Sequence, residues 1–230
     1  MKEAVKKKSA GKSAPAAVRD NLTVEVIVTA AIGLLQKDGL AGLSMRQLAA
    51  TLDVTPTAIY HHVKDKDELL DLCAVEILAQ IPKSDRSLPW PQRLRTLIIE
   101  QQRVFMRVPG LAKFLLVHRE SSVASLLWAE AVLSVMHDAG FKAQQSLPVL
   151  MSMSFLLNPI TLVDDKQPAK FTPVLYRTRA TALIKKHPGM FPCVSQVLPL
   201  MQAGSYESQF ETALDRVISG IEQELAGRPA

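Results

Sequence analysis

The chain has 230 residues, of which 48% are hydrophobic and 5% aromatic, and it carries a formal net charge of +5. This is ample apolar material for one sizeable core or two small ones, which excludes disorder for most of the chain. No apolar run approaches the roughly 18 residues of a membrane-spanning helix, and no apolar stretch follows the N-terminal lysines. We therefore expect a cytoplasmic protein with no membrane segment and no secretory signal.

The N-terminal segment, residues 1–20, is rich in lysine, alanine, serine and proline, and residues 1–19 carry six basic side chains against one acidic side chain. Such a composition cannot build a core, so we predict a disordered basic arm. Two roles stay open for this arm. It lies along DNA phosphates or in a minor groove when DNA is bound, or it is only a solubilising tail.

The first helix is predicted to follow Thr23. Apolar residues recur behind it with the spacing of one helix face, and Asp38-Gly39 supplies a C-terminal cap. The residues of this face are Ile27, Ala30, Ala31, Leu34 and Leu35.

Two short amphipathic segments joined by a tight break lie between Leu43 and Lys66, in the residues LSMRQLAATLDVTPTAIYHHVKDK. Ser44 and Gln47 form a capping box, so a helix is predicted to start at Ser44. It buries a stripe of apolar residues that runs out at Leu52, and the next two residues make the break. This arrangement is typical of a DNA-binding helix-turn-helix.

The second helix of the pair is predicted to begin at Thr55, which caps it, while Pro56 takes the first turn, where no amide hydrogen is needed. Ile59 and Val63 face the first helix. The opposite face carries no acid and offers groups that contact base edges or donate to phosphate. Its residues are Thr57, Ala58, Tyr60, His61 and His62. The alternative is a generic helical pair on which these aromatics are ordinary surface residues.

A longer helix is predicted from Asp65, which forms a capping box with Glu68, to Ile81, where Pro82 stops it. The stretch 20–82 is acidic, with nine acidic and four basic side chains. Attraction to DNA must therefore come from a few well-placed cations and the N-terminal arm rather than from a broad basic patch. These cations are Arg46, Lys64 and Lys66.

Beyond Pro82 the patterns stay helical. Further helices are predicted over residues 91–106, from Ser121 or Ser122 to Gly140, over the strongly apolar segment 144–163, and over 206–225. Pro148 and Pro159 are expected to kink or stop the apolar segment. Because no strand pattern competes, the predicted fold class is all-α.

From about Val24 to Ile81 the chain resembles the tetracycline-repressor (TetR) family of bacterial transcription regulators, through the residues VEVIVTAAIGLLQKDGLAGLSMRQLAATLDVTPTAIYHHVKDKDELLDLCAVEIL. The resemblance implies a three-helix helix-turn-helix DNA-binding domain, residues 21–68, joined by a long helix to a larger helical domain, residues 69–230, that binds an effector and dimerises. In the family, the helices corresponding to 144–163 and 206–225 form a four-helix bundle with a second subunit. The alternative is that both helices only fill the core of one subunit.

The resemblance also implies DNA contacts. Arg46 lies where related regulators reach a base or a phosphate, and an arginine can bind guanine O6 and N7 with two hydrogen bonds. Two residues of the second helix take base-facing positions, and others take positions that hold phosphate in the family. The implied DNA-binding residues are Arg46, Thr55, Pro56, Thr57, Ala58, Tyr60, His61, His62 and Lys66.

The larger domain is expected to hold the effector in a pocket between its helices, lined for an apolar ligand with one or two polar anchors. The candidate lining residues are Phe105, Met106, His118, Trp128, Met151, Phe155 and Asn158. The alternative is that these are ordinary core residues. In the tetracycline-responsive members a histidine that helps to hold drug and metal lies just beyond a segment resembling residues 110–114. Here Leu115 follows, so tetracycline with magnesium is not the expected effector.

The predicted function is that of a dimeric, ligand-responsive repressor that occupies a palindromic operator and is released by a small apolar or amphipathic effector. A constitutive DNA-binding or architectural protein without an effector is one alternative. An all-α enzyme is the other, and it is disfavoured because no nucleophile, base or metal-ligand set stands out. We therefore predict no catalytic residue, no metal and no cofactor. Cys73 and Cys193 are expected to be two buried thiols rather than a disulfide.

Overall fold

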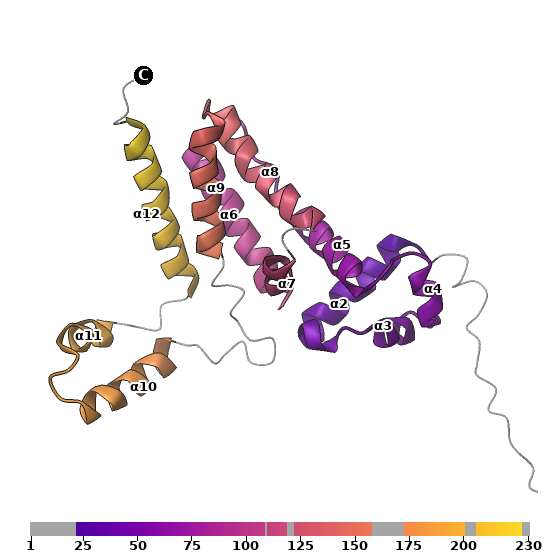
Figure 1. Ribbon diagram of the computed structural model, residues 1–230, viewed down its shortest axis with the longest axis horizontal. Helices are drawn as coiled ribbons and strands as arrows, with labels where there is room; N and C mark the ends of the chain where they lie inside the picture. Colours follow the sequence, from indigo (N-terminus) through magenta and orange to yellow (C-terminus); the bar gives the residue numbers. More distant parts are fainter. Residues whose placement is uncertain (1–21, 109, 119–121, 158–172, 201–205, 227–230) are drawn as a thin grey trace, which may run out of the picture.

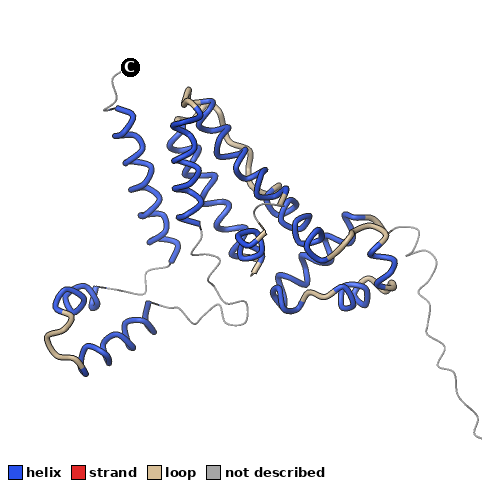
Figure 2. Tube along the Cα trace, in the orientation of Figure 1, coloured by secondary structure: helices blue, strands red, loops and turns tan. Residues whose placement is uncertain are grey.

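The computed structural model describes residues 22–108, 110–118, 122–157, 173–200 and 206–226, and within these ranges all regular structure is helical (Figure 2). The predicted basic arm, residues 1–20, and Asn158 lie outside the described residues. The helices are α2 (Val24–Gly42), α3 (Met45–Thr51), α4 (Pro56–Tyr60), α5 (Lys66–Leu78), α6 (Trp90–Met106), α7 (Leu111–Val117), α8 (Val123–Asp138), α9 (Ala143–Leu157), α10 (Pro173–Lys186), α11 (Pro192–Val197) and α12 (Tyr206–Ala226). A short 3-10 helix, η3, covers Leu198–Leu200.

The helix starts predicted in the first third of the chain are confirmed by their caps. The Thr23 hydroxyl accepts from the Val26 N–H at the start of α2, and Ser44 and Thr55 cap α3 and α4 in the same way. The predicted break at Asp38-Gly39 is also present, because Gly39 has φ +66°. At this φ a side chain is strained, so glycine suits the position. The chain coils on to Gly42 after this break.

The break between α3 and α4 is made by Asp53, whose φ of +53° lies in the left-handed region that aspartate tolerates better than most residues. It reverses the chain so that α4 packs on α3. Ile59 and Val63 are buried against this pair, as predicted, although α4 itself ends at Tyr60. Together with α2 and α5 these helices form one hydrophobic core, whose fully buried members include Ile27, Leu35, Leu48, Ile59 and Leu69.

Helix α5 begins as predicted and ends earlier than predicted. Asp65 accepts from the Glu68 N–H, and the Glu68 carboxylate accepts from the Lys64 N–H, which completes a reciprocal cap. The helix ends at Leu78 rather than at Ile81. Its last turn tightens, with Ile81 N–H donating to the Leu78 carbonyl, because the residue before Pro82 disfavours the α conformation.

A second core lies between α6, α8, α9 and α12, at the opposite end of the molecule from α3 and α4 (Figure 1). Its buried members are Leu94, Ile98, Ile99, Val132, Val135, Met136, Val149, Leu150, Met153, Phe210, Leu214 and Ile218. Arg95 of α6 ties α12 to this bundle, with hydrogen bonds of 2.7 and 2.8 Å to Asp215 and Glu211. The helices predicted over 91–106, after Ser122 and over 206–225 are all present.

Three helices have no counterpart among the specific predictions. Helix α7 follows Gly110, whose φ is +86°, and it buries Leu111 and Phe114. Helices α10 and α11 contact η3. No helix in the described ranges is long and apolar enough to cross a membrane.

Both cysteines are free thiols, as predicted, but only one is buried. Cys73 is fully buried on α5, where loss of hydration raises the pKa of its thiol to about 12. Cys193 is exposed on α11, so the expectation of two buried thiols was wrong. Residue type alone favours burial for cysteine, and the short α11 has no buried face among its described residues.

Asp138 at the end of α8 neutralises Arg93, whose side chain is buried. The Arg93 Nη2–Asp138 Oδ2 distance is 2.7 Å, and Arg86 lies 3.2 Å from the same oxygen. The hydrogen bond from Arg93, followed by the positive charges nearby, lowers the pKa of Asp138. The stabilisation is therefore present above the unfolded pKa and is lost as the pH falls through the lower folded pKa.

We predict that Asp138→Asn lowers the free energy of unfolding at neutral pH, because a buried guanidinium loses its counter-charge. The difference in free energy of unfolding between wild type and variant should be largest at neutral pH and should vanish as the pH falls below about 4. Urea unfolding at several pH values measures it, with Glu222→Gln at an exposed carboxylate of α12 as the control. If the difference in free energy of unfolding does not depend on pH, charge pairing with Asp138 is not its cause.

Lys66 at the start of α5 ties that helix to the link between α2 and α3. Its Nζ donates to the Leu43 carbonyl at 2.6 Å and to the Leu40 carbonyl at 3.4 Å. We predict that Lys66→Met lowers the free energy of unfolding by about 1–3 kcal/mol, because buried carbonyls lose a charged donor. The matched control is Lys64→Met at the exposed neighbouring lysine, which should stay within about 0.5 kcal/mol of wild type in the same urea titration. Equal effects of the two changes would contradict the structural role of Lys66.

Candidate DNA interface and effector cavity

Helix α4 and the residues that flank it present most of the predicted DNA-binding residues to solvent. Thr55, Pro56, Thr57, His61 and His62 are exposed. Tyr60 is 49% exposed, while its neighbour Ile59 is fully buried against α3. Figure 1 shows α3 and α4 at the end of the molecule away from α9 and α12. A short helix held by its buried face and carrying hydroxyl, phenol and imidazole groups outward can enter a DNA major groove.

Arg46 is exposed one residue after the start of α3. The acids of this region are mostly tied to helix starts and do not lie on α4. Asp65 and Glu68 cap α5, Asp71 caps α8, and Glu25 lies in the first turn of α2. The acidic total of residues 20–82 therefore does not place negative charge on α4, whose sequence contains no acid. Arg46 is free to meet a phosphate or a base.

Two predicted residues sit differently from expectation. Ala58 is half-buried and packs against the core that α2, α3, α4 and α5 share, so it is not fully turned outward. The ammonium of Lys66 already donates to two backbone carbonyls, which leaves one of its three N–H groups for another partner. Sequence reasoning missed this contact because Leu43 is 23 residues away along the chain.

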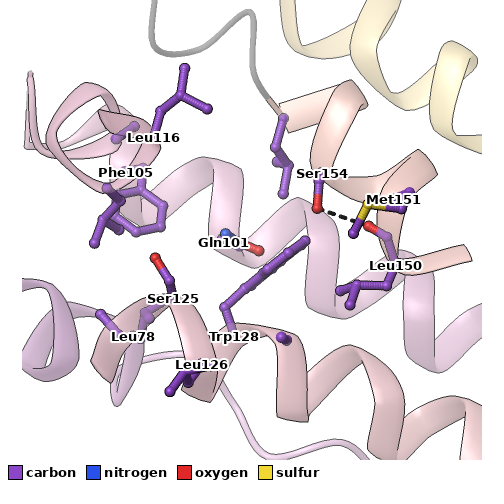
Figure 3. A pocket seen from close by; sticks show the side chains of 15 residues that line it. Leu78, Gln101, Phe105, Leu116, Ser125, Leu126, Trp128, Leu150, Met151 and Ser154 are labelled. Atoms are coloured by element: carbon purple, nitrogen blue, oxygen red, sulfur yellow. Dashed lines mark hydrogen bonds between the residues drawn. The ribbon is translucent and has the colours of Figure 1, made fainter. Parts of the chain in front are cut away.

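A cavity of about 230 Å³ opens between α5, α6, α7, α8 and α9 (Figure 3). Its described lining holds no ionisable side chain. The lining residues are Leu78, Gln101, Phe105, Ala112, Leu115, Leu116, Ala124, Ser125, Leu126, Trp128, Ala129, Leu150, Met151, Ser154 and Leu157. The volume exceeds the roughly 150 Å³ of an engineered cavity that binds benzene, so it suits a small apolar molecule.

The structure brings three of the predicted ligand-binding residues to this cavity and leaves three elsewhere. Phe105, Trp128 and Met151 line it. Met106 and Phe155 are 48% and 69% exposed, because they follow the inward residues Phe105 and Ser154 by one position, which is about 100° around a helix. His118 stacks on Phe114 outside the lining, with ring centroids 4.5 Å apart.

Helix α5 reaches both regions. It packs on α2 in the first core, and its Leu78 lines the cavity. The Asp71 carboxylate joins α5 to the start of α8, another cavity wall. It accepts from the Ser122 hydroxyl at 2.6 Å, from the Val123 N–H at 2.8 Å and from the Ala124 N–H at 3.2 Å. A carboxylate at a helix N-terminus satisfies otherwise unpaired N–H groups and favours the helix dipole.

Within the described ranges, no group of three or more histidine, cysteine or acidic side chains is placed to hold a metal ion. The described lining of the cavity also lacks an acid, a base and a thiol, which are groups that a catalytic site commonly uses.

Comparison with known proteins matches both parts of the chain. The model described as "Bacterial regulatory proteins, tetR family" matches residues 27–73, and the "Tetracyclin repressor-like, C-terminal domain" matches residues 82–225. The class D tetracycline repressor protein of Escherichia coli is 30% identical over 209 residues, which cover 89% of this chain and 91% of the relative.

Two solved structures share the fold. The Streptomyces coelicolor TetR family protein ActR in complex with (S)-DNPA aligns with a TM-score of 0.69 and 24% identity, over 87% of this chain and 97% of ActR. BioQ with its double-stranded DNA operator aligns with a TM-score of 0.55 and 24% identity, over 72% of this chain and 98% of BioQ. At these identities the likeness shows the fold alone. The family models and the bacterial repressor show more: the chain belongs to the tetR family of bacterial regulatory proteins, which are transcriptional regulators and not enzymes.

Proposed function

We propose that this regulator represses transcription as a homodimer on a palindromic operator and is released when a small apolar or amphipathic molecule fills the cavity beside α5. One observation carries the proposal. Helix α5 packs on the helix-turn-helix through α2, and the same helix lines the cavity through Leu78. A ligand that changes the packing around α5 therefore acts on the orientation of the DNA-binding helices.

In this proposal, successive segments of the chain have different roles. Residues 21–68 meet DNA, residues 69–230 bind the effector and dimerise, and the basic arm at residues 1–20 adds sequence-independent attraction to phosphate. The cytoplasm, where bacterial DNA lies, is the proposed location. The DNA contacts are those named from the sequence, with Thr57 and Tyr60 on the exposed side of α4, His61 directly after this helix, and Arg46 on α3. Lys66 joins them through its remaining N–H.

Dimerisation through α9 and α12 is supported by the apolar residues that α9 leaves exposed. They pack together in the second core, yet Leu147 and Phe155 of α9 are 56% and 69% exposed. Large apolar side chains on one helix that stay open to solvent suit an interface with a second copy. Phe155 serves this interface in the proposal instead of the ligand site assigned to it from the sequence.

Release requires that the ligand binds better to one spacing of the two helix-turn-helix units than to the other. The Asp71 carboxylate supplies a stiff connection for this, because it fixes α5 to the first turn of α8, close to the cavity residues Ser125 and Trp128. The constitutive alternative, without an effector, does not explain a 230 Å³ apolar cavity next to the connecting helix.

The DNA interface is tested with a fluorescent operator selected from random DNA. Arg46→Ala should weaken operator binding by about 1–3 kcal/mol and relax sequence preference, because a bidentate base contact is lost. Tyr60→Phe removes one phosphate-binding hydroxyl and should weaken all sequences alike. Fluorescence anisotropy at two salt concentrations measures both effects.

The control for Arg46→Ala is Lys113→Ala on α7, which removes the same charge from an exposed position outside the helix-turn-helix. Its operator affinity should equal that of wild type at moderate salt. Equal losses at positions 46 and 113 would mean that net charge alone drives binding and would contradict the proposed interface.

Asp71→Asn tests the connection between α5 and α8. The variant keeps the shape of the side chain but weakens the hydrogen bonds to the α8 N-terminus, so unliganded protein should hold the operator within a few-fold of wild type. Release by a compound found in a thermal-shift screen should need about tenfold more compound. The comparison is Glu76→Gln, at an exposed acid further along α5. Unchanged release from the Asp71 variant would remove this residue from the mechanism.

A further inference from the structure

One buried polar atom of the cavity has no partner. Gln101 of α6 is only 8% exposed and lines the cavity, yet its Oε1 accepts no hydrogen bond from the described part of the chain. Figure 3 shows the Gln101 amide in the middle of the labelled apolar side chains. An unpaired buried acceptor costs a free energy comparable to that of a lost hydrogen bond, so its retention calls for an explanation.

Trp128 of α8 supplies the complementary group. Its Nε1–H is also buried and without a partner among the described residues, and its indole lines the same cavity. Ser154, another polar side chain of the lining, already has a partner, because its hydroxyl donates to the Leu150 carbonyl at 2.9 Å. The cavity therefore combines a free acceptor and a free donor with apolar walls.

We infer that the cavity recognises a neutral, ring-containing molecule through a hydroxyl or similar group that donates to Gln101 Oε1 and accepts from Trp128 Nε1–H. This inference rests on the proposed function and specifies its effector class. Neutrality follows from the described lining, where no side chain can pair with a charge, so that an ion would lose its hydration without compensation. The size follows from the volume of about 230 Å³, which accommodates a two-ring compound.

The test uses three two-ring probes of nearly the same shape, titrated calorimetrically into the full-length protein at neutral pH. They are 2-naphthol, naphthalene and 2-naphthoate. We expect 2-naphthol to bind about tenfold more tightly than naphthalene, as one net hydrogen bond allows. We expect 2-naphthoate to bind more weakly than either probe. Equal affinity for 2-naphthol and naphthalene, tightest binding of the anion, or no binding of any probe would each overturn the inference.

Gln101→Leu identifies the anchor, because it keeps the volume and removes the acceptor. The preference for 2-naphthol over naphthalene should shrink severalfold, because only the hydrogen bond from Trp128 remains, while naphthalene binds at least as well as to wild type. Trp128 also borders a second cavity beside Arg93, whereas Gln101 lines the first cavity and not the second, so Gln101 is the better position for this change. An unchanged preference in the Gln101 variant contradicts the assignment.

The matched control is Gln102→Leu, the same substitution at the next residue of α6. Gln102 is 3% exposed and its Oε1 also lacks a partner within the described residues, but it does not line the cavity. Both variants should raise the unfolding midpoint by a few degrees, because each removes an unpaired buried acceptor. Only Gln101→Leu should change the probe preference. If Gln102→Leu changes it equally, the effect is structural and the inference is wrong.

The outcome is separable from that of the proposed function. The preference for 2-naphthol over naphthalene is measured without DNA, so its outcome does not depend on the effect of Arg46→Ala on operator binding. If the preference is found and 2-naphthol leaves operator binding unchanged, the cavity chemistry is confirmed and the release mechanism is contradicted.

Discussion

Three hydrogen bonds from the start of α8 to the Asp71 carboxylate fix α5, which belongs to the core of the DNA-binding helices, to a helix that lines the cavity. The first turn of α8 and the middle of α5 share this one acceptor group, at distances between 2.6 and 3.2 Å. The other contacts of α5 with this part of the molecule are mostly apolar, apart from Asp67 Oδ2, which lies 4.0 Å from His118 Nδ1. Helix α5 packs on α2 at the DNA-binding end and contacts α6, α7 and α8, which line the cavity, so Asp71 adds a polar connection to a broader contact between the two regions.

Local features of the sequence predicted local structure well. Ser44, Thr55 and Asp65 are predicted as caps, a helix is predicted to follow Thr23, and Ser122 is one of two predicted starts for a later helix. Each of these five residues accepts a backbone N–H from three residues later. A cap depends on neighbours along the chain, so its signal is complete within about four residues. The same holds for the buried stripe of α3 and for the outward face of α4, from which most of the candidate DNA interface was predicted.

Contacts between distant segments could not be read in this way. Asp71 meets residues 51 to 53 positions later, and Lys66 meets Leu43, so neither partner was identified from spacing. The cavity shows the same limit. Its helices were predicted, but the rotation of each helix about its axis depends on packing against its neighbours. Phe105 and Met151 therefore face inward, whereas Met106 and Phe155 lie one residue beyond an inward position.

In the proposed mechanism, the cavity and the DNA-binding surface are coupled through one change in shape. Coupling of this kind is reciprocal, because both ligands act on the same equilibrium. The most direct measurement is the affinity of a cavity ligand for free protein and for protein saturated with its operator. In this mechanism, bound operator weakens ligand binding by the same factor by which bound ligand weakens operator binding. Equal ligand affinity in the two states would contradict it.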